Sequence, residues 1–268
     1  MTPAIEGRSA LRVYWQPGCT SCLRAKEFLE ANGIPYVSVN VRTSATAAAE
    51  LAELGVRTVP IVARGRDYVL AQDIDELAHF VGMAVSRTRL APDELVARLH
   101  ALLAASESLL AAMPAARLHD SLPQRERTWL DLGFHVAMIV QGLITAGTGG
   151  ELAYEIYERR APESWRTAGP AIEFSQATRR GLASWWQRAR RRPNAPVRTY
   201  FGERPLESVL ERSAWHAGQH CRQLDYLVHE VARVADAPRL PASVLQGLPV
   251  PASVWDREVV PGDSLPIS

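Results

Sequence analysis

Hydrophobic and polar positions in the first third of the chain alternate between two periods. Short runs with the period of a strand separate longer runs with the period of a helix. The pattern predicts strands at 11–15, 35–41, 58–65 and 67–71, the last two joined as a hairpin, and helices at 20–33, 44–55 and 73–82. Ser44 is the expected N-cap of the second helix, and Gly33 and Gly55 end the first two. This order predicts a small α/β domain over residues 1–82.

The pattern changes after Gly82, where helical periods take over and no further strand is expected. Long helices are predicted at 92–113, 125–147, 170–190 and 205–235. Their number and length are typical of a four-helix bundle covering residues 92–237, after a linker over 83–91. Residues 238–268 are rich in proline and weakly periodic, so they predict an irregular tail packed on the bundle through Leu248, Val250 and Trp255.

Composition and charge narrow the class of protein. The 268 residues are 47% hydrophobic, which is enough material for two cores. With 30 basic and 29 acidic residues the net charge is +1, so no general attraction to nucleic acid or an anionic membrane is expected. The basic run at 188–192 is typical of a solvated helix end. We find neither an uncharged apolar run of the roughly 18 residues that a membrane span needs nor a secretory signal pattern, and expect a soluble, cytoplasmic protein.

The stretch WQPGCTSCLRAK carries two of the three cysteines. A strand followed by a Pro17–Gly18 turn places Cys19 at a helix N-terminus, where unpaired N–H groups and the macrodipole stabilise a thiolate. Cys22, one turn later, can then attack a mixed disulfide formed on Cys19. A zinc site here would need further ligands, and the first 78 residues contain no histidine and no third cysteine. Two packed structural cysteines remain the alternative, and Lys26 is expected to add positive potential from a solvated position.

Three motifs together resemble the glutaredoxins, within the thioredoxin fold, over about residues 10–82. They are GCTSC after a strand, Thr58-Val59-Pro60 before the next strand, and Asp73 at the start of the last helix. The resemblance implies a cis Pro60 facing the cysteine pair. It also implies that Thr58, Val59, Pro60 and Asp73 lie beside a bound thiol such as glutathione. Thr20-Ser21 departs from the Pro-Tyr or Gly-Phe of many glutaredoxins, so the redox potential and substrate preference are not carried over.

The second informative group is three histidines. His216 and His220 are four residues apart, so both imidazoles project from one side of a helix. His135 interrupts an almost wholly apolar helix, with Asp131 one turn before it. These three imidazoles could bind one divalent cation with an open coordination position, and Asp131 could orient His135. Histidines satisfied within the core are the alternative.

One mid-bundle histidine, followed by HxxxH in a last helix that begins after TYFGERPLESVL, resembles the DinB-like family, also called YfiT-like metal enzymes. The likeness covers about residues 90–255. It implies a metal at His135, His216 and His220, zinc first, with nickel or iron as alternatives. Several members are transferases or isomerases that use a low-molecular-weight thiol such as mycothiol, bacillithiol or glutathione.

Together these patterns predict a thiol-dependent metalloenzyme of the transferase or isomerase type, coupled to a glutaredoxin-type disulfide exchange domain. A small thiol and a small electrophilic or disulfide substrate are the expected partners, nucleic acid and membranes are not, and a homodimer is left open. The alternative is a thiol–disulfide oxidoreductase whose bundle senses a metal or docks a partner. A structural bundle without metal is the third hypothesis. Cys221, next to His220, is expected to be a buried core thiol.

Overall fold

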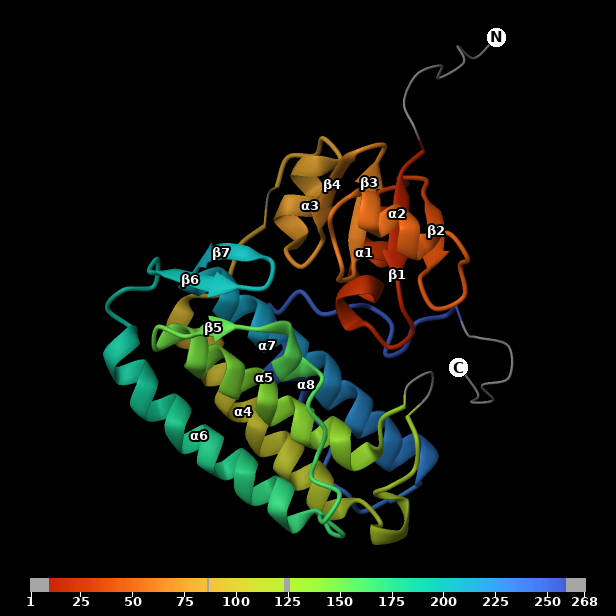
Figure 1. The fold of residues 1–268 in the computed structure, drawn as a ribbon. Coiled ribbons are helices and arrows are strands. Elements are labelled where there is room, and N and C mark those ends of the chain that lie inside the picture. The colour runs from red at the N-terminus through yellow and green to blue at the C-terminus, as the bar shows by residue number, and fades with distance from the viewer. Residues whose placement is uncertain (1–9, 86, 123–125, 259–268) are drawn as a thin grey trace. The chain divides into compact units, whose positions relative to one another are not determined.

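The computed structural model describes residues 10–85, 87–122 and 126–258 (Figure 1). Four parts of the sequence predictions lie outside the described residues. They are positions 1–9 of the α/β domain, linker position 86, position 125 at the start of the expected second bundle helix, and positions 259–268 of the tail. The described residues form two compact units, one from 10–87 with 251–258 and the other from 88–250.

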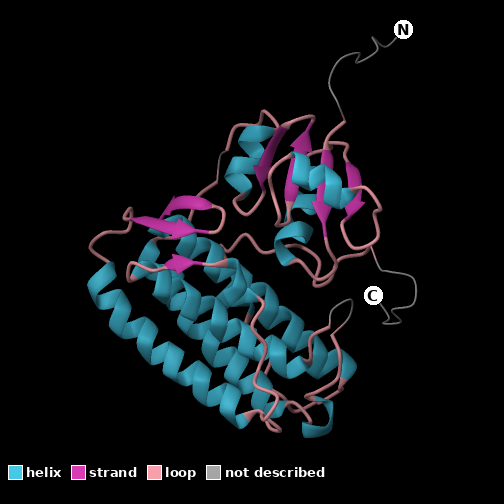
Figure 2. Ribbon diagram, viewed as in Figure 1, coloured by secondary structure: helices cyan, strands magenta, loops and turns pink. Residues whose placement is uncertain are grey.

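The first unit is built on a four-stranded sheet in the order β2-β1-β3-β4. Its strands are β1 (Arg12–Trp15), β2 (Val37–Asn40), β3 (Ile61–Arg64) and β4 (Asp67–Leu70). The strand β1 is parallel to β2 and antiparallel to β3, and β3 pairs with β4 in the predicted hairpin. This mixed sheet with helices on it is the α/β arrangement that the sequence predicts (Figure 2).

Helices cover both faces of this sheet, and its central strands β1 and β3 are buried on both sides. The helices are α1 (Thr20–Ala31), α2 (Ala47–Glu53) and α3 (Ile74–Phe80). Val13 packs with α1 and α3 in one buried cluster, whereas its neighbour Tyr14 packs with α2 in another. Helix α2 begins later than predicted, although the Ser44 hydroxyl accepts the N–H of Ala47 at 3.2 Å.

The second unit contains four long helices: α4 (Pro92–Ala112), α5 (Trp129–Gly147), α6 (Gly169–Ala189) and α7 (Leu206–Tyr226). Helices α4 and α5 each pack on both α6 and α7, which gives a four-helix arrangement. Gly133 in α5 permits close packing on α4, because a Cβ at this position would lie 2.5 Å from Leu110 Cδ2. Helices α4 and α6 lie within one residue of their predicted bounds, whereas α5 begins later than predicted and α7 ends at Tyr226 and continues as the π-helix η3 instead of reaching 235. Shorter helices are η1 (Ala115–Arg117), η2 (Tyr154–Tyr157), the π-helix η3 (Leu227–Val231) and α8 (Ala242–Leu245).

The prediction that strands end at Gly82 is wrong. A three-stranded sheet in the order β5-β6-β7 lies in the second unit, made of β5 (Glu151–Leu152), β6 (Pro196–Thr199) and β7 (Gly202–Pro205). These strands have two to four residues, too few for an alternating pattern to stand out. The β6–β7 hairpin leads directly into α7 and so fixes where the helix with His216 and His220 begins.

Two helices of the described residues, α4 and α5, are long and apolar enough to span a membrane by length and composition. No membrane span was predicted from the sequence. The core helix of a globular unit passes the same test, and 78% of the apolar window in α5 is buried inside the structure. These helices are therefore weak grounds for a membrane span.

The tail divides between the two units. Leu245, Leu248 and Val250 lie against Gly218 of α7, as expected for the tail's first part. The prediction that the rest also packs on the bundle is wrong for residues 251–258, which belong to the first unit. Hydrogen bonds with Glu27 and Lys26 hold this part of the chain, and a hydrophobic pattern does not indicate such bonds.

Candidate functional site

The cysteine pair lies where β1 turns into α1. Cys19 is the N-cap residue of α1, and its Sγ accepts the N–H of Cys22 at 3.2 Å. The two cysteines form a disulfide with their Cα atoms 5.2 Å apart. Cys22 is fully buried, whereas Cys19 is partly exposed. Cys19 is thus the sulfur that an incoming thiol reaches, at the helix end where a thiolate is stabilised.

The segment before β3 lies beside this pair. The Val59–Pro60 peptide bond is cis, as the resemblance implies. Val59 is buried in the same apolar cluster as Cys22, and Cys19 packs against that cluster. Thr58 is partly exposed, and Asp73 caps α3 by accepting the N–H of Asp75 at 2.9 Å. The contact of these residues with a thiol remains a prediction.

Gln72 lies beside the cysteine pair and was not predicted from the sequence. Its Oε1 accepts the Ser21 hydroxyl at 2.9 Å, and its Nε2 donates to the Val59 carbonyl at 3.3 Å. It is only 2% exposed. Gln72 therefore links the interior of the CxxC motif to the cis-proline segment. Gln72 lies between a strand and an N-cap aspartate, where a polar residue usually belongs to an exposed loop. The sequence pattern therefore did not indicate that it is buried.

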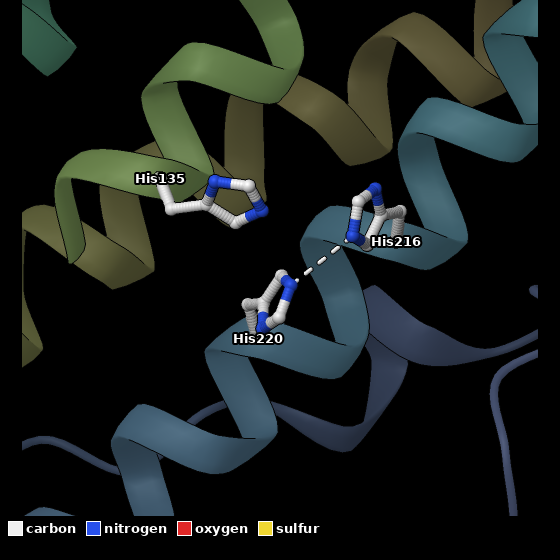
Figure 3. A group of neighbouring side chains, drawn as sticks. All are labelled: His135, His216 and His220. Atoms are coloured by element: carbon white, nitrogen blue, oxygen red, sulfur yellow. Dashed lines mark hydrogen bonds between the residues drawn. The ribbon is translucent and has the colours of Figure 1, made fainter. Parts of the chain in front are cut away.

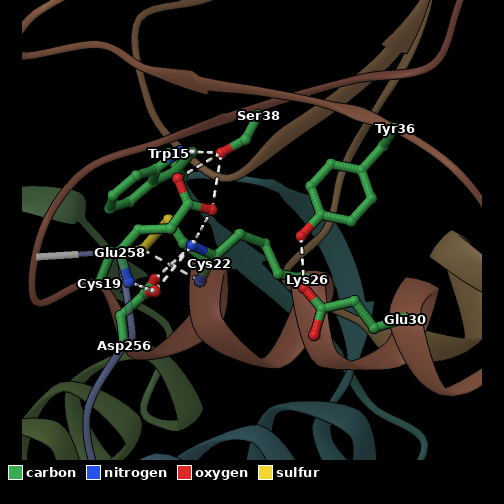
Figure 4. A network of polar contacts seen from close by, with 9 residues as sticks. All are labelled: Trp15, Cys19, Cys22, Lys26, Glu30, Tyr36, Ser38, Asp256 and Glu258. Atoms are coloured by element: carbon green, nitrogen blue, oxygen red, sulfur yellow. Dashed lines mark hydrogen bonds and ion pairs between the residues drawn. A yellow bond between two sulfur atoms is a disulfide. The ribbon is translucent and has the colours of Figure 1, made fainter. Parts of the chain in front are cut away.

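Lys26 differs from its prediction. It is 3% exposed rather than solvated, and its Nζ lies 2.7 Å from Asp256 Oδ2 and 2.9 Å from Glu258 Oε1 (Figure 4). The same ammonium lies 3.8 Å from the centroid of the Trp15 ring. A buried ammonium requires such partners, and here they are supplied by residues more than 200 positions later in the sequence.

The three predicted histidines converge in the second unit (Figure 3). His135 of α5 is 2% exposed, and His216 and His220 of α7 are 7% and 2% exposed. One ring nitrogen from each lies within 4.8 Å of the others, and the Nε2 atoms of His216 and His220 are 3.1 Å apart. His220 Nδ1 lies 2.7 Å from Gln223 Oε1, and donating to this oxygen leaves Nε2 as the lone-pair nitrogen towards His216.

This set of nitrogens fits a divalent cation. Imidazole nitrogens at bond lengths of about 2.1 Å around a tetrahedral ion lie about 3.4 Å apart. The separation of 3.1 Å between His216 and His220 is close to this value, and the third nitrogen lies within 4.8 Å. Three neutral ligands leave the ion its full charge and a fourth position for a water or thiol.

The predicted role of Asp131 in orienting His135 is wrong. Its carboxylate accepts the N–H of Thr128 at 2.9 Å and the N–H of Ala161 at 2.8 Å, and the Thr128 hydroxyl accepts the Asp131 N–H at 3.1 Å. This is a capping box that starts α5 and holds the loop before α6. The T-x-x-D spacing at 128–131 was the signal for it.

We expect Asp131→Ala to lower the free energy of unfolding by about 2 kcal/mol, because two partly buried backbone N–H groups lose their acceptor. Zinc binding to the folded variant should not change. Chemical denaturation and zinc titration measure the two quantities. If Asp131→Ala has unchanged stability but binds zinc poorly, the result would instead support a role of Asp131 in orienting His135.

Two more residues beside the histidines were not predicted. The Tyr157 ring centroid lies 5.3 Å from that of His216 and 5.8 Å from that of His135. Arg212, one turn before His216 on α7, donates to the hydroxyls of Tyr157 at 2.9 Å and Tyr200 at 2.8 Å. Burial raises the pKa of Tyr157, and Arg212 opposes this rise. The four-residue spacing from Arg212 to His216 and His220 could have indicated the shared face.

The free cysteine, Cys221, is fully buried, and burial raises the pKa of its thiol. Its Sγ lies 3.4 Å from the Leu102 carbonyl. These surroundings fit the predicted core thiol.

Comparison with known proteins finds a family match for part of the chain. Residues 11–69 match the glutaredoxin family. No curated protein and no solved structure matches the chain. The resemblance of the second unit to the DinB-like family therefore remains a prediction. Residues 11–69, by contrast, form a glutaredoxin-like domain whose cysteine pair supports a role as a thiol–disulfide oxidoreductase.

Proposed function

We propose that this chain is a thiol-dependent metalloenzyme that combines disulfide exchange at Cys19 and Cys22 with activation of a small thiol at His135, His216 and His220. The observation that carries the proposal is the convergence of three buried imidazoles within one unit of a chain whose other unit is glutaredoxin-like. The thiol would be glutathione or a similar molecule, and its second substrate a small electrophile.

Disulfide exchange follows from the position of each sulfur. The Cys19 thiolate attacks a mixed disulfide, forms a bond to one sulfur and releases the other as a thiol. Cys22 then attacks Cys19, releases the second thiol and forms the disulfide present in this structure. The substrate disulfide is reduced and the protein oxidised, and two molecules of a thiol such as glutathione return the pair to the reduced state.

In the second unit, His135, His216 and His220 would hold the cation, with zinc as the first candidate. A bound divalent cation acidifies a thiol at its open position, so that a thiolate is available near neutral pH. The chain contributes a buried setting, in which Gln223 orients the His220 ring. The Arg212 and Tyr157 pair adds a fixed positive charge and a phenol beside His216.

The test uses the full chain loaded with zinc, glutathione as the thiol, and 1-chloro-2,4-dinitrobenzene as the electrophile. We expect conjugation by the wild type and a loss of about a hundredfold or more in His216→Ala, because the thiol is no longer acidified. The exposed His119→Ala is the matched control. Disulfide exchange, measured separately, should be the same in all three proteins. Equal conjugation rates for the wild type and His216→Ala would contradict the metal-dependent activity. The remaining function would then be disulfide exchange, with the bundle as a sensing or docking module.

A further inference from the structure

The last described residues of the chain, 251–258, lie along the helix that carries the cysteine pair; we term them the C-terminal segment. The carboxylate of Glu27 in α1 accepts the N–H of Ala252 at 2.6 Å and that of Ser253 at 2.8 Å. Asp256 and Glu258 then reach Lys26, the preceding residue of α1. Both ends of the segment are thus held by neighbouring residues of one helix.

The Lys26–Asp256 pair is buried on both sides. The side chains are 4% and 6% exposed, whereas Glu258 is 45% exposed. Desolvating two charges is costly, and the pair persists only when the geometry is good and other groups contribute. Here the Trp15 ring lies under the ammonium, and Trp15 Nε1 donates to Ser38 Oγ at 2.7 Å, which itself donates to Glu258. The arrangement joins the C-terminal segment to residues on both sides of the cysteine motif.

Lys26 is well placed to act on the cysteine pair. It lies one turn after Cys22 in α1, and helical side chains lean towards the N-terminus, which here is Cys19. A cation near this end stabilises a thiolate and so favours the reduced pair. The other charged groups on α1 and the segment beside it include Arg24, Glu27, Glu30, Asp256 and Glu258. The two carboxylates on Lys26 offset its charge.

We propose that Asp256 is a positioning residue for disulfide exchange. Through its carboxylate the C-terminal segment holds the Lys26 ammonium against Trp15 and weakens the support that this charge gives to the reduced cysteine pair. The inference rests on the disulfide-exchange part of the proposed function and does not involve the histidines. The C-terminal segment contacts α1 in the structure. We infer from this contact that the segment shifts the redox equilibrium of the cysteine pair.

The test is the reduction potential of the Cys19–Cys22 pair in the full chain, equilibrated in glutathione redox buffers and trapped by alkylation. Asp256→Asn leaves Lys26 less compensated, so we expect the equilibrium to shift about tenfold towards the reduced pair, about 30 mV upward. Lys26→Met removes the cation and leaves the carboxylates, so the shift should be in the opposite direction. Purely structural damage would not give opposite signs.

Glu258→Gln is a milder variant that keeps the buried Lys26–Asp256 pair. We expect it to raise the reduction potential by less than Asp256→Asn does. Asp67→Asn, exposed on β4, is the matched control and should match the wild type. Equal potentials in wild type, Asp256→Asn and Glu258→Gln would overturn the inference, as would shifts of one sign in Asp256→Asn and Lys26→Met. If the variants show these shifts but the wild type catalyses no disulfide exchange, the proposed function is contradicted and this inference is not.

Discussion

Replacing Cys19 with serine is expected to reduce disulfide exchange by roughly a thousandfold or more, to near the uncatalysed rate. Cys19 is the partly exposed cysteine at the N-terminus of α1, and the proposed exchange begins with the attack of its thiolate. A serine hydroxyl at this position is not ionised near neutral pH and cannot form a disulfide. The measurement is the reduction of hydroxyethyl disulfide by glutathione, coupled to glutathione reductase and followed by NADPH consumption.

Two further variants make this result specific. Cys22→Ser removes only the resolving thiol, so a mixed disulfide with glutathione on Cys19 should accumulate and be visible by mass spectrometry. Cys221→Ala is the matched control, because this thiol is fully buried and its pKa is raised by burial. Exchange that persists in Cys19→Ser, or that is lost in a folded Cys221→Ala, would contradict the assignment of the nucleophile.

The second large effect concerns the histidines. We expect the wild type to bind about one zinc ion per chain, and His135→Ala, His216→Ala and His220→Ala each to retain less than about a tenth of it after dialysis. Each substitution removes one of three ligand nitrogens from a buried site. Elemental analysis after zinc loading gives the stoichiometry, and the exposed His119→Ala should bind as the wild type does.

Bound zinc should also stabilise the fold of the wild type. A ligand that binds only the native state, at a hundred times its Kd, adds about 2.7 kcal/mol to the free energy of unfolding. A chelator should therefore lower the melting temperature of the wild type and leave that of His216→Ala unchanged. Equal zinc content and equal chelator response in both proteins would exclude the triad as the site.

Much of the first unit could be predicted from sequence because each of its signals is local. Strand alternation, the Pro17–Gly18 turn and the T-V-P segment each depend on a few neighbouring residues, and the resulting sheet, helix-start cysteine and cis Pro60 are all present. The histidines were also predictable, since His216 and His220 share a helix face by spacing alone. Their convergence with His135 follows when the apolar helix α5 packs beside the amphipathic helix α7.

The remaining features depend on contacts that a pattern does not contain. The Lys26–Asp256 pair joins residues 230 positions apart. Of the apolar tail residues, Leu248 and Val250 pack on the second unit as predicted, whereas Trp255 belongs to the first. By its spacing from His135, Asp131 could either orient that imidazole or cap a helix. Its carboxylate accepts the backbone N–H groups of Thr128 and Ala161, which is the bonding of a cap. Gln72 acts through two hydrogen bonds across the fold, to Ser21 and Val59.

The central claim is that imidazoles from α5 and α7 hold one cation in the second unit. X-ray absorption at the zinc edge of the full, zinc-loaded chain tests it most directly. The account predicts three imidazole nitrogens at about 2.0–2.1 Å and one further light ligand. A shell containing sulfur at about 2.3 Å would place zinc on cysteines, and a shell of oxygens without imidazole would place it on surface carboxylates. Either result would contradict the claim.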